Sequence, residues 1–384
     1  MHPELWTIPG IGFPVRTWGF CVVVGFVVAL WIALRRTRRT GSDAETVLSM
    51  ALVGMILGVV GCRGMHVLHQ VWRGGAGVEG VRSVQALPSS GGGEILGGAV
   101  LAVLGVVAYL AIRRRPIRLY LDVVFPPMVL AMGIGRIGCL MFGCCWGAIC
   151  ETPAGNKALP WAVRFPYGSP AFVRHWAGGK IDVPAELIWA SPETNTPEPI
   201  LRGVLNHCDI DGDSDLALWA QKAGAYAIHR QGDPDSADTV RLAAELAAAR
   251  QVAGDHPREE FAASLHLQRL RSAGAAHLTW ADLRAQAASQ HSRWVHPTQV
   301  YDAVALVLLF FLLSALFRRR KRWGTVVAWT MILYPVNRIL QEMIRADNPR
   351  DVLGFTVSQA ASAVILLIGV GFLLVLRRGA HGAG

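Results

Sequence analysis

The sequence predicts an all-α polytopic membrane protein with about seven transmembrane helices and a small, helical, soluble insert. Hydrophobic residues make up 52% of the 384 residues and charged residues 17%, and the mean hydropathy is +0.36; this balance is typical of membrane proteins. About 20 apolar residues cross the hydrocarbon core. The expected spans are therefore residues 17–35, 44–72, 93–112, 120–146, 300–317, 324–345 and 355–376. No A-x-A-like cleavage site follows the first run, so it is expected to be a permanent span.

Basic residues follow alternate spans, at 35–39, 113–115, 318–322 and 377–378, and the formal net charge is +10. The positive-inside rule assigns these ends to the cytoplasm, which places the N-terminus outside and the C-terminus inside. A nucleic-acid partner would need basic residues on one soluble face with aromatic residues between them, and the sequence lacks that pattern. We therefore expect no nucleic-acid partner.

Three parts follow from this pattern. Residues 1–166 hold the first four spans and an outer glycine-rich loop, 167–294 form an extracytoplasmic insertion, and 295–384 hold the last three spans. Amphipathic stretches at 243–250 and 259–271 predict that the insertion is helical. An acidic run at 209–215 has Ser214 and Ala220 where a calcium loop needs glycine and glutamate, which favours a solvated turn.

The fourth span carries one arginine, Arg136, among the glycines Gly133, Gly135 and Gly138. A cation at membrane depth normally faces a polar cavity or an anionic partner, and the glycines leave room for another helix or a headgroup. Alternatively, Arg136 extends to an interface and only anchors the helix. We favour a functional role.

Two outer segments supply candidate headgroup ligands. A glycine-rich stretch at 89–98 can expose backbone N–H groups to an anion, or it can be only a connector. The stretch 296–302 crowds polar side chains at the entry to the fifth span, where they can bind a headgroup or serve as a helix cap and aromatic anchor. The candidates are Gly91, Gly92, Gly97, Gly98, His296, Gln299 and Tyr301.

The sixth span ends with Arg338, Glu342 and Arg345, which share one helical face because they are four and three residues apart. Glu342 can pair with both arginines, and the triplet keeps a net positive charge. Arginine binds phosphate through two parallel hydrogen bonds. Together with Arg136 this predicts a phosphate pocket; the alternative is a structural network of ion pairs between helices.

Of seven cysteines, Cys139, Cys144, Cys145 and Cys150 cluster around the outer end of the fourth span. The spacing lacks the paired C-x2-C motifs of a zinc site. Small, buried, unreactive thiols are the favoured interpretation, although a disulfide to Cys150 or Cys208 stays open in an oxidising compartment. His66 and His69 are expected to be interfacial polar residues. We therefore predict no metal and no cofactor.

These residues resemble the prolipoprotein diacylglyceryl transferases of bacterial inner membranes. The resemblance covers all seven spans in order and leaves out roughly 167–294. The positions that carry it are Asp122 with Pro126, GIGRIG at 133–138, Trp146 with Gly147, PWAVRFP at 160–166, HPTQVY at 296–301, Arg338, Glu342, Arg345, Asp347 and Gln359.

The resemblance implies transfer of the diacylglyceryl group of phosphatidylglycerol to the lipobox cysteine of a preprolipoprotein, with release of glycerol phosphate. The expected location is the bacterial inner membrane, and the expected partners are phosphatidylglycerol, the signal peptides of preprolipoproteins and membrane lipid. Arg136 and Arg338 would stabilise the leaving phosphate, Glu342 would orient the arginines, and His296 is a candidate proton acceptor. The other implied substrate-binding residues are Gly91, Gly92, Gly97, Gly98, Gln299, Tyr301, Arg345, Trp18 and Cys144.

Four positions depart from the family pattern. Leu96 stands where the glycine loop has a histidine, Cys139 where the arginine motif continues with asparagine, Cys144 where a glutamate precedes the Trp-Gly pair, and Trp18 where the first span has a tyrosine. A mechanism that uses the loop histidine as the base therefore cannot apply unchanged; Glu94 or His296 could substitute. The alternatives are a non-catalytic or altered-acceptor lipid-binding or transport protein on the same scaffold, and a receptor or assembly factor that the spans only anchor.

Overall fold

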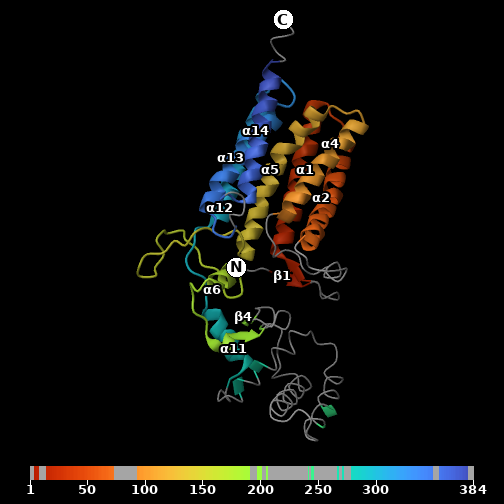
Figure 1. Ribbon diagram of the computed structural model, residues 1–384. Helices are drawn as coiled ribbons and strands as arrows, with labels where there is room; N and C mark the ends of the chain where they lie inside the picture. The colour runs from red at the N-terminus through yellow and green to blue at the C-terminus, as the bar shows by residue number, and fades with distance from the viewer. Residues whose placement is uncertain are drawn as a thin grey trace. The chain divides into compact units, whose positions relative to one another are not determined.

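Among the residues that the computed structural model describes, seven long helices form the membrane part (Figure 1). The structure describes residues 4–7, 14–72, 93–190, 197–200, 278–348 and 354–378, with a few single positions between 205 and 271. The helices are α1 (Thr17–Thr40), α2 (Ala44–Trp72), α4 (Gly93–Ile112), α5 (Ile117–Phe142), α12 (Thr298–Arg319), α13 (Thr325–Ile344) and α14 (Val357–Arg378). A short antiparallel pair of strands, β1 (Glu4–Thr7) and β2 (Pro14–Arg16), precedes α1.

These helices lie at the seven predicted spans, and the prediction of an all-α polytopic membrane protein is confirmed. Within the described residues, α1, α5, α12, α14 and the Ala44–His66 part of α2 have the length and hydropathy of membrane spans, and α4 contains a shorter apolar helix, Leu96–Ile112. The predicted end of the fourth span at residue 146 is wrong. Helix α5 ends at Phe142 because Gly143 adopts a left-handed conformation, with φ +82°, and its N–H donates back to the Cys139 carbonyl.

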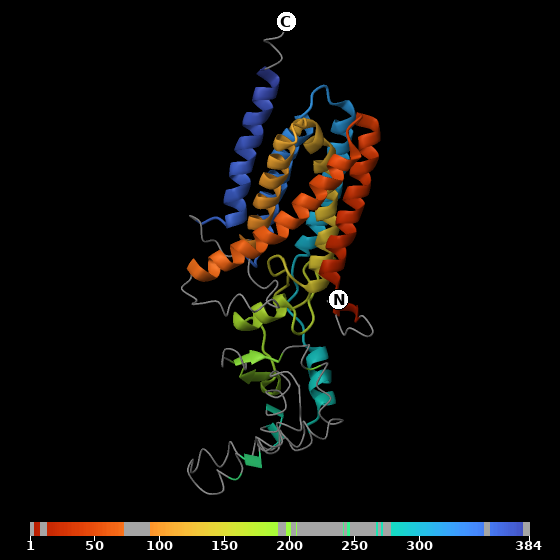
Figure 2. The same cartoon turned by 90° about the vertical axis from the view of Figure 1, so that its right-hand side faces the viewer.

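Helix α5 is the centre of the bundle, since α1, α12 and α13 all pack against it, while α2 packs against α4 and α13 against α14 (Figures 1 and 2). A close approach between α1 and α5 depends on Gly25. A Cβ atom there would lie 2.8 Å from the Ala131 carbonyl oxygen, which is too close for any side chain. The sequence thus brings α1 against the helix that carries Arg136.

A buried carboxylate fixes the start of α13. The side chain of Asp122 on α5 is fully buried; its Oδ2 accepts from the Gly324 N–H at 2.8 Å and its Oδ1 accepts from the Val327 N–H at 2.9 Å. A charged acceptor satisfies the free N–H groups at a helix N-terminus and interacts favourably with the helix dipole. Asp122 therefore aligns α13, at whose other end Arg338 lies, against α5.

Residues Ile149–Val295 form a compact unit separate from the bundle, which comprises Met1–Ala148 and His296–Gly384. Its described elements are α6 (Pro170–Ala177), the 3₁₀-helix η1 (Ala185–Leu187), strands β3 (Ile188–Ala190) and β4 (Pro197–Pro199), and α11 (Trp280–Ser289). Its buried core includes Phe172, Trp189 and Trp280. Most of the helices predicted at 243–250 and 259–271, the acidic run at 209–215 and Cys208 lie outside the described residues.

A polar cluster organises this unit around Glu151. Its Oε2 pairs with Arg293 Nη2 at 2.5 Å, and its Oε1 accepts from the Trp294 N–H at 2.6 Å. The N–H of Arg293 donates to Nδ1 of the buried His175 at 3.2 Å. Burial, followed by the nearby charges of Lys180 and Arg293, lowers the pKa of His175 to about 4. The imidazole is therefore neutral at pH 7, as its role as acceptor requires.

Candidate active site

Three helices meet in a buried network at one end of the bundle. Arg136 on α5 pairs through Nε with Oδ2 of Asp302 on α12 at 2.6 Å. Asn337 on α13 donates to the other oxygen of Asp302 at 2.8 Å. The side chain of Asp302 is 6% exposed and that of Arg136 18% exposed. Burying a charge is tolerable only when it is paired, so this network fixes Arg136 at the ends of three helices.

The arginines of α13 form a second network. Arg338 Nη2 lies 2.8 Å from Glu342 Oε2 and donates to Ser358 Oγ on α14 at 3.1 Å. Arg345 lies 3.6 Å from the same Glu342 oxygen, and Asn348 donates to the other. The predicted shared face of Arg338, Glu342 and Arg345 is therefore present, with Glu342 between the two arginines.

Asp347 changes the charge expected for this face. It accepts from Arg345 Nε and Nη2 at 2.9 and 2.7 Å. The net positive charge predicted for the triplet is thereby offset. Arg338 Nη1, however, is buried and has no hydrogen-bond partner among the residues that the structure describes, so this guanidinium retains an unused donor.

The loop after α5, at residues 143–148, is held between the start of α12 and the end of α13. Gln299 Nε2 donates to the Cys144 carbonyl at 2.6 Å and Thr298 Oγ1 to the Cys145 carbonyl at 2.5 Å. The backbone then pairs on both sides, because the Gly147 N–H donates to the His296 carbonyl and the Ala148 N–H to the Ile344 carbonyl.

Gly147 has no room for a side chain. A Cβ atom there would lie 2.7 Å from His296 Cβ and 2.8 Å from Thr298 Cγ2. The Trp-Gly pair identified in the sequence is therefore a packing requirement that places the loop beside the arginines.

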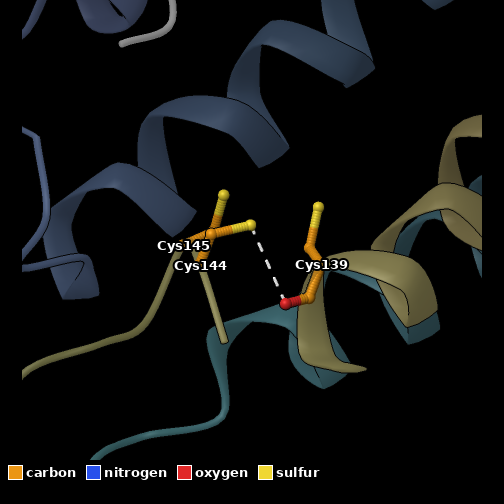
Figure 3. A group of neighbouring side chains, drawn as sticks. All are labelled: Cys139, Cys144 and Cys145. Atoms are coloured by element: carbon orange, nitrogen blue, oxygen red, sulfur yellow. Dashed lines mark hydrogen bonds between the residues drawn. The ribbon is translucent and has the colours of Figure 1, made fainter. Parts of the chain in front are cut away.

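Three thiols come together at the end of α5 (Figure 3). Cys139, in the last turn of α5, and Cys144 and Cys145, in the loop, have their Sγ atoms within 4.8 Å of one another. Cys144 Sγ donates to the Cys139 carbonyl at 3.8 Å, and Arg136 Nη1 donates to Cys145 Sγ at 3.6 Å. Among the described cysteines these three form no disulfide, and neither does Cys150.

The remaining predicted residues divide into three groups. His296 Nδ1 lies 3.3 Å from the Tyr301 hydroxyl, next to the same loop, and a Cβ atom at Gly138 would lie 2.9 Å from Trp18 Cα, which places Trp18 against α5 near Arg136. Gly97 and Gly98 instead lie within α4, where Cβ atoms would meet Met65 and Cys62 of α2; within the described residues, the contacts of the arginine networks do not reach them. Gly91 and Gly92 lie outside the described residues.

Comparison with known proteins decides the family. The sequence model of the prolipoprotein diacylglyceryl transferase family matches residues 3–375.

The chain belongs to the prolipoprotein diacylglyceryl transferase family.

Individual relatives agree with this assignment. A phosphatidylglycerol–prolipoprotein diacylglyceryl transferase of Rhodopirellula baltica is 25% identical over 392 residues, which cover 96% of this chain and 74% of that protein. Proteins of the same name are 32% identical over 155 residues in Corynebacterium efficiens and 34% identical over 172 residues in Mycobacteroides abscessus. These two alignments cover 40% and 44% of this chain, and 45% and 46% of the relatives.

Several residues of this prolipoprotein diacylglyceryl transferase site could not be identified from the sequence. Asp302 lies in the polar stretch 296–302, and no sequence pattern singles out Asn337, Ser358 or Asn348. A carboxylate near the start of an apolar span was the available signal for Asp302, because such a charge needs a partner. Nothing in the sequence pairs Ser358 with Arg338, since that contact depends on how α14 packs against α13.

Proposed function

We propose that this protein transfers the diacylglyceryl group of phosphatidylglycerol to the cysteine thiol of prolipoproteins and releases glycerol phosphate. The observation that carries the proposal is the partly buried arginine pair, Arg136 and Arg338, at one end of a bundle whose sequence matches the transferase family from residue 3 to 375. The names of the relatives give the two substrates.

Arg338 is the better placed of the two to bind the lipid phosphate. Its Nη1 is a buried donor without a partner, and leaving a buried charged donor unsatisfied costs about 1–3 kcal/mol or more. A phosphate oxygen beside Nη1 would remove that cost. Glu342 and Ser358 hold Nη2, so the side chain is oriented before the lipid arrives, and Glu342 is a positioning residue.

An apolar groove of about 460 Å³ between α12 and α13 suits an acyl chain. Its polar end is Asn337, whose amide donates to Asp302, the partner of Arg136. A phospholipid with a tail in the groove would have its headgroup near the arginines. The groove is lined by Ala305, Leu308, Leu309, Leu312, Leu333, Val336, Asn337 and Leu340.

The chemistry assigns a role to each group. The acceptor sulfur attacks the glyceryl carbon that bears the phosphate, the carbon–oxygen bond breaks, and glycerol phosphate leaves with the electron pair. Arg136 and Arg338 donate to the phosphate oxygens, where negative charge develops; preorganised donors of this kind lower the barrier by about 3–4 kcal/mol each. His296, hydrogen-bonded to Tyr301, is a side-chain candidate for taking the thiol proton.

We further infer an orientation in the bacterial inner membrane with the N-terminus outside and the C-terminus in the cytoplasm. The arginine networks lie where α12 begins, at Thr298, and a basic cavity of about 500 Å³ lies where α12 ends. Basic residues favour the cytoplasmic side, so the proposed active site would face outward. The cations that line the cavity are Arg36, Arg39, Arg318, Arg320, Lys321 and Arg322.

A purified-protein assay tests the proposal. Detergent-solubilised protein, phosphatidylglycerol and a lipobox peptide are combined, and released glycerol phosphate is measured. We expect release only with the thiol-bearing peptide, none with its Cys→Ala form, and none from Arg136→Ala or Arg338→Ala. Retained activity in both variants would remove the phosphate-binding argument.

A non-catalytic lipid-binding protein is the second candidate. The observation that favours it is the pairing of each of the three arginines with a carboxylate, which is also how a purely structural network looks. Folded protein that binds phosphatidylglycerol without releasing glycerol phosphate would select this alternative.

A further inference from the structure

The three clustered thiols have the geometry of a metal site. In a tetrahedral zinc site with Zn–S bonds of about 2.3 Å, ligand sulfurs lie roughly 3.8 Å apart. The Sγ atoms of Cys139, Cys144 and Cys145 already lie within 4.8 Å of one another. Small side-chain rotations therefore bring all three onto one ion, and Figure 3 shows them converging from α5 and the adjoining loop.

The backbone around these thiols is shaped in a way that simple packing does not require. Cys145 has φ +62°, a conformation that costs a non-glycine residue about 1–2 kcal/mol. Hydrogen bonds from Gln299 and Thr298 hold the Cys144 and Cys145 carbonyls. The strained turn directs two consecutive side chains to the same side as Cys139.

We propose that Cys139, Cys144 and Cys145 bind one zinc ion as thiolates, and that the fourth zinc position receives the thiol of the acceptor peptide. Thiolates select soft cations such as zinc, and three protein ligands with one open position are the pattern of catalytic rather than structural zinc. This inference rests on the proposed transferase function. It departs from the interpretation of these cysteines as inert thiols, which the spacing alone favoured.

Arg136 links the zinc site to the phosphate site. Three thiolates around Zn²⁺ carry a net charge of −1, and the guanidinium that donates to Cys145 Sγ at 3.6 Å offsets part of it. Arg136 is also one of the two proposed phosphate ligands. The acceptor sulfur on the zinc and the phosphate on the arginines would therefore be neighbours, which is the juxtaposition that transfer needs.

The zinc ion would supply the function of a base. The peptide thiol displaces a zinc-bound water molecule and loses its proton to water, because coordination deprotonates a thiol. The bound sulfur attacks the glyceryl carbon, the carbon–oxygen bond to phosphate breaks, and glycerol phosphate leaves with the electron pair. The thioether product is a weak ligand and dissociates. Leu96, where the family pattern has a histidine, would then be no obstacle.

Zinc content provides the first test. We expect about one zinc ion per chain in the purified protein and a loss of at least about ten-fold in zinc occupancy in Cys139→Ser, Cys144→Ser and Cys145→Ser. Cys62→Ser is the matched control, since Cys62 lies in α2 against Gly98 and should leave zinc unchanged. Equal, trace zinc in all five proteins would overturn the proposal, as would a disulfide between any two of the three cysteines.

Cobalt substitution of the wild-type protein tests the open position without relying on variants. Co²⁺ bound by thiolates absorbs in the near ultraviolet, and the absorption grows with the number of thiolate ligands. Adding the lipobox peptide should raise it by about one third, from three thiolates to four, whereas a Cys→Ser peptide should not. A cobalt absorption that does not change when the thiol peptide is added would overturn the proposed role of the fourth position.

The two proposals fail in different ways. Metal-free protein that transfers at the wild-type rate would overturn the zinc site and leave the transferase standing. Zinc-loaded protein that binds the peptide thiol, yet releases no glycerol phosphate from phosphatidylglycerol, would overturn the transferase and support the zinc site.

Discussion

Replacing Arg338 by lysine isolates the donor that the structure leaves unused. Lysine keeps the positive charge, and its ammonium can still pair with Glu342, but it lacks the planar fork that presents Nη1 alongside Nη2. Arg338 Nη1 is buried without a partner, while Nη2 is held by Glu342 and Ser358. Losing one preorganised donor to a developing charge costs about 2.7–4 kcal/mol, so kcat should fall about 10²–10³-fold.

The assay is the release of glycerol phosphate as a function of phosphatidylglycerol concentration. Because the lost donor acts on charge that develops in the transition state, kcat should fall more than KM rises. Ser358→Ala is the matched control: it removes one hydrogen bond from the same charged guanidinium, costs about 1.5–3 kcal/mol of stability, and leaves Nη1 in place. If Arg338→Lys, shown to be folded, lost no more activity than Ser358→Ala, the phosphate role of Nη1 would be refuted.

Three further outcomes follow from the packing and the charges. Gly147→Ala should destabilise the protein by about 1–3 kcal/mol through overpacking and should reduce transfer. Gly135→Ala should do neither, because a Cβ atom at Gly135 would have no described atom within 4 Å. Thermal unfolding measures the stability of both variants, and glycerol phosphate release measures their transfer activity. Val336→Trp, which fills the apolar groove, should raise KM for long-chain phosphatidylglycerol more than for short-chain lipid, and an unchanged ratio of the two would argue against an acyl-chain groove. His175 has a pKa of about 4 in the folded protein and about 6.5 in the unfolded chain. As the pH drops, the unfolded chain therefore binds a proton at His175 before the folded protein does. The free energy of unfolding should fall between pH 6.5 and pH 4, by at most about 3 kcal/mol. His175→Asn keeps an acceptor for the Arg293 N–H and should remove that pH dependence, measured as the rate of proteolysis within residues 149–295.

The sequence was sufficient for the helices because their signal is local. Spans predicted at 44–72 and 93–112 match α2 and α4 to the residue, since an apolar run bounded by turn formers or charges leaves little choice of ends. The predicted outer end of the fourth span was wrong for a conformational reason. Residues 143–146 remain apolar, but Gly143 adopts a left-handed conformation and ends the helix. The hydropathy of a sequence carries no information about backbone dihedral angles.

The site was only partly predictable because its partners are distant in sequence. Arg338, Glu342 and Arg345 could be grouped, since helical periodicity alone puts them on one face. The pairing of Arg136 with Asp302 spans 166 positions and depends on how α5 packs against α12. The convergence of Cys139 with Cys144 and Cys145 depends on the turn at Gly143.

The balance of charges in the arginine networks is compatible with catalysis at membrane depth. Arg136, Arg338 and Arg345 face Asp302, Glu342 and Asp347 in near one-to-one pairs, so the resting site avoids the large cost of isolated buried charges. A carboxylate can accept hydrogen bonds from only some of the five N–H groups of a guanidinium. The remaining N–H groups keep fixed directions because the ion pair holds the guanidinium in place. A phosphate whose charge grows during bond cleavage gains from such oriented donors even when the net charge around it is zero, since no solvent or side chain must reorganise. Asp302→Asn leaves Arg136 charged but less firmly oriented, so it should lower kcat although it makes the site more positive. A faster Asp302→Asn enzyme would mean that net charge, rather than orientation, limits the reaction.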